Sequence, residues 1–251
     1  MQTQVSEISE NIYRLSTYLP EAGPGGFSFN QFLINADEPL LFHTGLRQTF
    51  DSVATAIATV MPLKKLRWIC FGHFEADECG AMNQFLSAAP NATVAHGELG
   101  VILSVMDQAD RPPRALSDGE TIDLGSKRVQ YFATPHVPHG WDAGLLFEER
   151  TKTLFAGDLF TIGGKYPTQT EGDLLERAIR FEEMMPGTAL TAATAPTIRR
   201  LAALAPKTLA LMHNSALSGD GQKALENLAS YYGKRFDESV RIPTAARGDS
   251  Q

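Results

Sequence analysis

The chain alternates short apolar runs, bounded by turn residues, with segments whose apolar positions recur at helical spacing. Segment 49–61 carries Val53 and Ile57 one helical turn apart and stops before Pro62, so it predicts a helix. A second helix is predicted over 79–88. In this first half of the chain, the runs typical of strands cover residues 12–15, 29–34, 40–42 and 66–71.

The second half repeats this pattern. Strands are predicted over residues 121–122, 129–133, 145–147, 153–155 and 208–212. Helices are predicted over residues 172–185, 197–204 and 221–236. Two β-rich halves, each closed by helices, predict an α/β (α+β) fold in which two sheets pack face to face with helices outside. Because no linker or repeat divides the sequence, we expect residues 1–251 to form a single domain, with a frayed tail over 243–251.

Composition and charge narrow the classes of function. Apolar residues make up 43% of the chain and charged residues 20%, which is ordinary for a soluble globular protein. The net charge of −7 argues against nucleic acid or an anionic membrane as a partner, since both prefer a basic face. The N-terminus has no basic segment before an apolar run, and no stretch approaches the length of a membrane span. We therefore expect a cytoplasmic protein, in which Cys70 and Cys79 are free thiols.

Three residues with side chains that bind metals follow the predicted strand 66–71. His73, Glu75 and Asp77 stand two positions apart, between this strand and the next predicted helix. In an extended or tightly turned loop this spacing can aim all three side chains at one point, whereas on a regular helix they would splay apart. The competing interpretation is an ordinary helix start, because acidic residues are favoured near a helix N-terminus.

The same residue types recur where other predicted strands end. His136 and His139 follow one strand, Asp158 follows the next strand but one, and His213 follows the last strand. Strand ends are rigid places from which loops present functional side chains. The recurrence therefore favours a metal site over a chance acidic helix start.

The order of these motifs resembles that of the metallo-β-lactamase superfamily: strand-HxxxD-helix, a later His, a Gly-Asp after a strand and a final strand-His. The first motif reads His73-x-Glu75-x-Asp77, where the hydrolases usually have H-x-H-x-D-H. This form is similar to the di-iron domain of flavodiiron proteins and of related oxygen-binding di-iron proteins. The similarity runs over nearly the whole chain, including the apolar run 29–34. It implies a metallo-β-lactamase αββα four-layer sandwich.

The resemblance also implies a set of ligands. One metal would be held by a group that includes His73 and Glu75, and a second metal by Asp77 and His213, with Asp158 bridging the two. For the missing ligand of the first metal there are two candidates, and we choose His139. The predicted metal ligands are His73, Glu75, Asp77, His139, Asp158 and His213.

The choice between the two histidines rests on the turn that follows. His139 begins an H-x-x-D turn that ends at Asp142, as in flavodiiron proteins, and reaches Asp158 without a gap against the family pattern. His136 would require an insertion, so we expect it beside the ligands rather than on a metal.

The inferred set, three imidazoles and three carboxylates, bears on which metal is bound. Glu75 in place of an imidazole adds negative charge and a hard oxygen donor, which suits iron or manganese better than zinc. We therefore expect two iron ions, with two zinc or manganese ions as the alternatives.

Some positions depart from the family pattern or allow two interpretations. Glu78 stands where many relatives have a histidine for the second metal, and it could bind the metal, hold a water or face solvent. Phe29 stands where the family often has a tyrosine. His43 is either a polar residue at a strand end or a hydrogen-bond partner near the ligands. His96 is expected in a loop.

The resemblance implies a protein that binds O₂ or NO and reduces the bound gas if electrons arrive. The chain has no CxxC pair and no room for a flavodoxin domain, so we expect no flavin within it and a separate electron-donor protein. It would then act as an oxygen sensor or a stand-alone reductase, and it could form a homodimer. The alternative is a dinuclear metallohydrolase, in which a metal-bound hydroxide attacks an ester, lactone or phosphoester.

Overall fold

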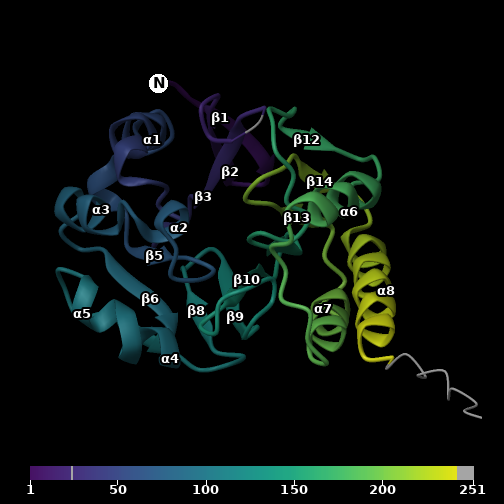
Figure 1. The fold of residues 1–251 in the computed structure, drawn as a ribbon. Helices are drawn as coiled ribbons and strands as arrows, with labels where there is room; N and C mark the ends of the chain where they lie inside the picture. The colour runs from purple at the N-terminus through teal and green to yellow at the C-terminus, as the bar shows by residue number, and fades with distance from the viewer. Residues whose placement is uncertain (24, 242–251) are drawn as a thin grey trace, which may run out of the picture.

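A computed structural model describes residues 1–23 and 25–241, and the predicted frayed tail over 243–251 lies outside the described residues. Two seven-stranded sheets lie between two layers of helices (Figure 1). One outer side carries α1 (Phe50–Ala58) and α3 (Met82–Ala88), and the other carries α6 (Leu175–Met184), α7 (Thr194–Ala202) and α8 (Gly221–Ser239). These layers confirm the predicted αββα sandwich. No helix within the described residues is both long enough and apolar enough to cross a membrane.

The first sheet comes from the N-terminal half of the chain. Its strands follow one another in sequence order, antiparallel from β1 to β4 and parallel from β4 to β7. They are β1 (Thr3–Ser9), β2 (Ile12–Leu19), β3 (Phe27–Ile34), β4 (Leu40–Phe42), β5 (Trp68–Cys70), β6 (Thr93–Gly97) and β7 (Arg114–Leu116).

Short helices fill the crossovers between the parallel strands of this sheet. The helix predicted over 49–61 begins as a 3-10 turn and ends at Ala58, and the helix predicted over 79–88 is two helices, α2 and α3. The helices of this half are η1 (Arg47–Thr49), α1 (Phe50–Ala58), η2 (Leu63–Lys65), α2 (Ala76–Cys79), α3 (Met82–Ala88), α4 (Glu98–Gly100), η3 (Val101–Val105) and α5 (Met106–Gln108).

The second sheet has the order β12-β14-β13-β11-β10-β9-β8. Within it β11 pairs in parallel with β13 and β12 in parallel with β14, while the other pairs are antiparallel. The strands are β8 (Thr121–Asp123), β9 (Arg128–Ala133), β10 (Gly144–Glu148), β11 (Thr153–Phe155), β12 (Gln169–Thr170), β13 (Thr208–Ala210) and β14 (Ala216–Ser218).

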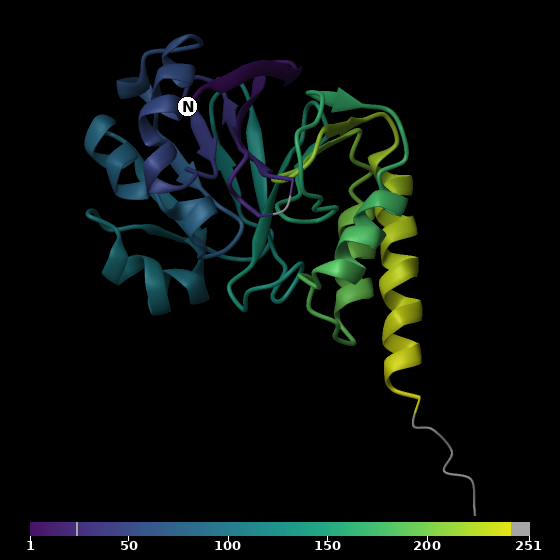
Figure 2. The ribbon, with the colours of Figure 1, turned by 45° about the horizontal axis from the view of Figure 1, so that its top comes forward.

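Three longer helices cover the outer face of this second sheet. They are α6 (Leu175–Met184), α7 (Thr194–Ala202) and α8 (Gly221–Ser239), and Figure 2 shows α8 running beside α7 along the outside of the molecule. Asp220 caps the first turn of α8, because its side chain accepts a hydrogen bond from the backbone N–H of Lys223.

The strand sequences explain the layers, because successive side chains point to opposite faces of a sheet. On β3, Leu33 packs toward the outer helices, whereas Phe32 packs between the sheets. On β4, Leu41 likewise packs toward the outer helices and Phe42 packs between the sheets. Both faces of these two strands carry apolar side chains, since one face is covered by the outer helices and the other by the second sheet.

The same topology brings several strand ends to one edge of the sandwich. The loops that follow β5, β11 and β13 carry candidate ligands, and the loop between β9 and β10 reaches the same edge. This edge is where the chemistry suggested by the sequence is concentrated.

Candidate metal centre

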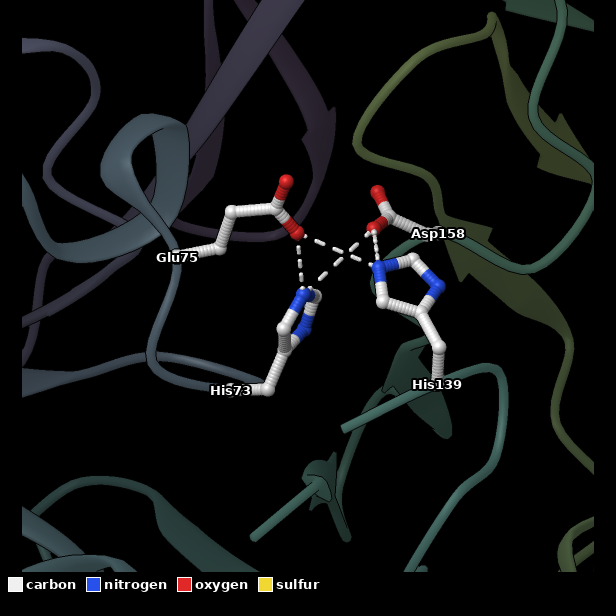
Figure 3. A group of neighbouring side chains, drawn as sticks. All are labelled: His73, Glu75, His139 and Asp158. Carbon is white, nitrogen blue, oxygen red and sulfur yellow. Dashed lines mark hydrogen bonds and ion pairs between the residues drawn. The ribbon is translucent and has the colours of Figure 1, made fainter. Parts of the chain in front are cut away.

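Four of the predicted ligands converge on one point, as Figure 3 shows. His73, Glu75, His139 and Asp158 each offer one donor atom, and these atoms lie within 4.8 Å of one another. The Nε2 atom of His73 lies 2.6 Å from Oε2 of Glu75, and Nε2 of His139 lies 3.1 Å from the same oxygen. His139 Nε2 is also 3.4 Å from Oδ2 of Asp158.

The other two predicted ligands lie on the far side of Asp158. Nε2 of His213 is 3.2 Å from Oδ2 of Asp77 and 3.3 Å from Oδ1 of Asp158. Asp158 thus turns one oxygen toward each group. A carboxylate in that position can bridge two metal ions.

The loop after β5 sends Glu75 and Asp77 in different directions. Glu75 has extended backbone angles and precedes α2, whereas Asp77 lies in the first turn of that helix. The spacing alone allowed Asp77 to share one target with His73 and Glu75, but Asp77 instead lies beside His213, with which the family resemblance groups it. Because the backbone changes from extended to helical between Glu75 and Asp77, Glu75 reaches His139 and Asp77 reaches His213.

Asp142 connects two segments of the site: the turn that carries His139, and the loop that carries His73 and Glu75. One oxygen of Asp142 accepts the backbone N–H of Phe74 at 2.9 Å and lies 3.1 Å from Nε2 of His96. His96 is buried on β6 and stacks on Phe71, so the expectation that it belongs to a loop is wrong.

Each buried ligand histidine has a partner on its other ring nitrogen, as is usual for histidines that bind metals. Nδ1 of His73 lies 3.2 Å from Oε1 of the fully buried Glu78. Nδ1 of His213 lies 3.0 Å from the carbonyl oxygen of Ser28. His43, which is buried, places its Nε2 atom 3.4 Å from Oε1 of Glu78 and so completes a buried polar cluster beneath the ligands.

The carboxylates change the acidity of the histidines. Burial opposes a charged His73, but Glu78 and Glu75 outweigh burial and raise its pKa to about 11. Burial likewise opposes a charged His213, while Asp158 and Asp77 raise its pKa to about 10. Burial disfavours the ionised Asp158, yet His213 and its neighbours lower the pKa of this carboxyl to about 2.

These shifts bear on whether the residues fit metal ions. The carboxylates gather enough negative charge to keep the imidazoles protonated, and a metal cation can replace those protons. Oδ1 of Asp158 and Nδ1 of His139 are buried yet have no hydrogen-bond partner. A mixed nitrogen and oxygen donor set with an unpartnered carboxylate oxygen at its centre fits a pair of metal ions.

A cavity of about 160 Å³ opens above the two groups. Its apolar wall contains Phe27, Pro138, Phe181 and Met185, and the ligands form much of its floor. The ring of Phe27 meets His213 edge-on at 5.2 Å between centroids. The cavity therefore suits a small molecule rather than a bulky one.

The structure does not bring His136 to this site, contrary to the expectation that it lies beside the ligands. Its side chain is exposed, and it is absent from the lining of the cavity. Sequence reasoning left the position of Glu78 open and assigned no role to Asp142. The signal for Asp142 was its place at the end of the H-x-x-D turn.

The four layers and the donors at the strand ends define a metal-binding protein of the metallo-β-lactamase fold. A family model described as "ODP family beta lactamase" matches residues 27–210, and the chain belongs to this family.

Curated relatives carry names of flavodiiron proteins. Rubredoxin-oxygen oxidoreductase of Megalodesulfovibrio gigas is 26% identical over 163 residues, which make up 62% of this chain and 40% of that protein. Flavo-diiron protein FprA2 of Clostridium acetobutylicum is 24% identical over 53% of this chain and 34% of its own length. The aligned segments therefore cover well under half the length of these two relatives.

Solved structures agree on the fold. The structure of rubredoxin oxygen:oxidoreductase from Desulfovibrio gigas has a TM-score of 0.77 at 19% identity, over 92% of this chain and 62% of that one. A fragment, residues 1–254, of putative diflavin flavoprotein A 5 from Nostoc has a TM-score of 0.76 at 17% identity, over 94% and 96% of the two chains. The predicted resemblance to the flavodiiron core is confirmed for family and fold.

Proposed function

We propose that this chain is a non-haem di-iron protein that binds O₂ or NO, and that it reduces the bound gas when a donor supplies electrons. The observation that carries the proposal is the placement of Glu75 between His73 and His139, with Asp158 turned toward both donor groups. Two ferrous ions held there would supply the electrons and the open coordination positions for the gas.

The donors favour iron by their chemical type. Each group mixes imidazole nitrogen with carboxylate oxygen, and hard oxygen donors suit iron or manganese better than they suit zinc. Glu75 has about half of its side chain exposed at the cavity, so it can adjust its position as the charge at the site changes. The proposed ligands are His73, Glu75, Asp77, His139, Asp158 and His213.

The cavity supports a small apolar gas as the ligand. Phe27, Phe181 and Met185 keep part of its wall apolar, and its volume of about 160 Å³ leaves little space for a large substrate. A relative whose name couples rubredoxin with oxygen supports a separate donor protein for this chain as well. Whether the protein acts as sensor or reductase then depends on how fast that donor delivers electrons.

The test is rapid mixing of the anaerobic, iron-loaded and reduced protein with O₂, followed by absorption spectroscopy. We expect each reduced chain to react with O₂ once, and this reaction should change the near-ultraviolet or visible absorption. Further O₂ should be consumed only after an electron donor is added. Zinc-loaded protein is the matched control, because an ion with a filled d shell gives no such absorption. The same samples are offered small ester and phosphodiester substrates, and we expect no cleavage. If the iron-loaded protein stays colourless and does not react with O₂, but hydrolyses one of the substrates, the chain is a metallohydrolase instead.

A further inference from the structure

The two donor groups are not equivalent. His73, Glu75, His139 and Asp158 form a compact set of four donors aimed at a common point, as Figure 3 shows. In the part of the chain that the structure describes, this is the one group of three or more such donors that closes to within 4.8 Å. We call it the four-donor group.

The second group has fewer donors. Asp77 and Asp158 each place an oxygen beside Nε2 of His213, at 3.2 Å and 3.3 Å. We call this the three-donor group. A metal ion there would keep more coordination positions open, because the protein supplies fewer of its ligands.

Glu78 is the residue that could have supplied a further donor, but its carboxylate points elsewhere. Its Oε2 atom accepts the backbone N–H of His73 at 2.6 Å, and its Oε1 atom lies 3.2 Å from Nδ1 of the same residue. Both oxygens therefore face His73: Oε2 is hydrogen-bonded to its backbone, whereas Oε1 lies close to its ring but has no hydrogen-bond partner. His43 lies on the other side of the carboxylate, at 3.4 Å from Oε1.

The position of Glu78 should raise the metal affinity of the four-donor group and leave the three-donor group with fewer ligands. A charged carboxylate close to the second ring nitrogen of a ligand histidine favours one orientation of the ring and increases its basicity. Glu78 thus supports the four-donor group through His73 and leaves the three-donor group without a further carboxylate.

We propose that the chain fills its metal sites in order, the four-donor group first and the three-donor group second, and that Glu78 is the positioning residue that sets this order. The inference rests on the proposed di-iron function. It places the binding of the external gas at the second ion, where more positions are open.

The experiment is an anaerobic titration of the metal-free chain with Fe²⁺, in which native mass spectrometry counts the ions bound per chain. We expect the one-ion form to dominate near one equivalent, well above the share that two equal and independent sites would give. Asp77→Asn should keep the first ion with unchanged affinity and lose the second, because Asp77 belongs only to the three-donor group.

Glu78→Gln tests the positioning role. Glutamine has nearly the same shape and retains one oxygen, but it removes the charge beside Nδ1 of His73. We expect the first ion to bind about 10–100-fold more weakly and the one-ion form to lose its dominance. Glu98→Gln, on the exposed surface of α4, is the matched control and should leave both steps unchanged. Circular dichroism of each metal-free variant checks that the fold is retained.

Two results would overturn the loading order alone: uptake of both ions together with no one-ion form, or loss of the first ion in Asp77→Asn. If a folded Glu78→Gln variant binds the first Fe²⁺ with unchanged affinity, Glu78 does not set the loading order. A chain that binds no iron at any concentration contradicts the proposed function itself, and the loading order with it.

Discussion

Nε2 of His139 lies 3.1 Å from Oε2 of Glu75, although the two residues are 64 positions apart in the sequence. The contact joins the turn before β10 to the loop after β5, and so ties the two halves of the sandwich together at the site. His136, three residues before His139, points into solvent instead.

The first prediction uses these two histidines as a matched pair. His139→Ala should lower the iron content of the protein substantially, because it removes one of the four donors in the four-donor group. His136→Ala should leave the iron content unchanged, since that side chain is exposed and outside the cavity. Metal analysis of both variants after anaerobic purification decides the matter. Equal losses from the two would mean that the turn acts through its backbone rather than through His139.

Asp142 provides a second prediction, on stability. Asp142→Ala leaves the backbone N–H of Phe74 and the ring of His96 without their acceptor. We expect the free energy of unfolding to fall by about 1–3 kcal/mol, the usual cost of an unsatisfied buried polar group. Asp142→Asn retains an acceptor and should lose less. Urea unfolding of the metal-free variants measures the difference, and a larger loss in Asp142→Asn would contradict this explanation.

The third prediction concerns the choice of metal. Glu75→His replaces a hard oxygen donor with an imidazole and should shift the metal content from iron toward zinc. The test is to purify the variant from cells supplied with both metals and to measure its ratio of iron to zinc. Glu75→Gln serves as the control, because it removes the charge without adding a nitrogen ligand. An iron content equal to that of the unaltered protein would show that donor type at this position does not govern selection.

The layers of the fold could be predicted because they depend on local patterns. Residues 32–34 are apolar at successive positions, and in β3 Phe32 and Leu33 do pack on opposite faces of the first sheet. The positions of Asp158 and His213 also follow from sequence, since each comes within three residues of the end of a buried strand, where the chain leaves the sheet.

The direction of Glu78 could not be predicted, because it is fixed by a distant segment. The carbonyl oxygen of Glu78 accepts the backbone N–H of Thr44, just after β4, at 2.6 Å. This contact anchors the end of the ligand loop and leaves the side chain beneath His73. The pairing of His96 with Asp142 is equally long-range, so the short run before His96 gave no sign of it.

The last prediction concerns the pH dependence of folding. His73 and His213 have pKa values raised from 6.5 to about 11 and about 10. A raised pKa in the folded state contributes stability that is fully present below 6.5 and is lost as the pH rises through the folded value. The metal-free protein should therefore become less stable as the pH rises from 6.5 toward 10.

Metal ions should remove this trend, because the metal takes the place of the protons and binds the neutral imidazoles. Metal affinity should accordingly increase over the same range of pH. Melting temperatures of metal-free and zinc-loaded protein at about pH 6.5 and about pH 9 measure both effects, with zinc used because air does not oxidise it. His213→Gln should flatten the slope of the metal-free protein, because its side chain does not titrate there. If the metal-free protein instead gained stability toward pH 9, the carboxylates would not be holding protons on these imidazoles.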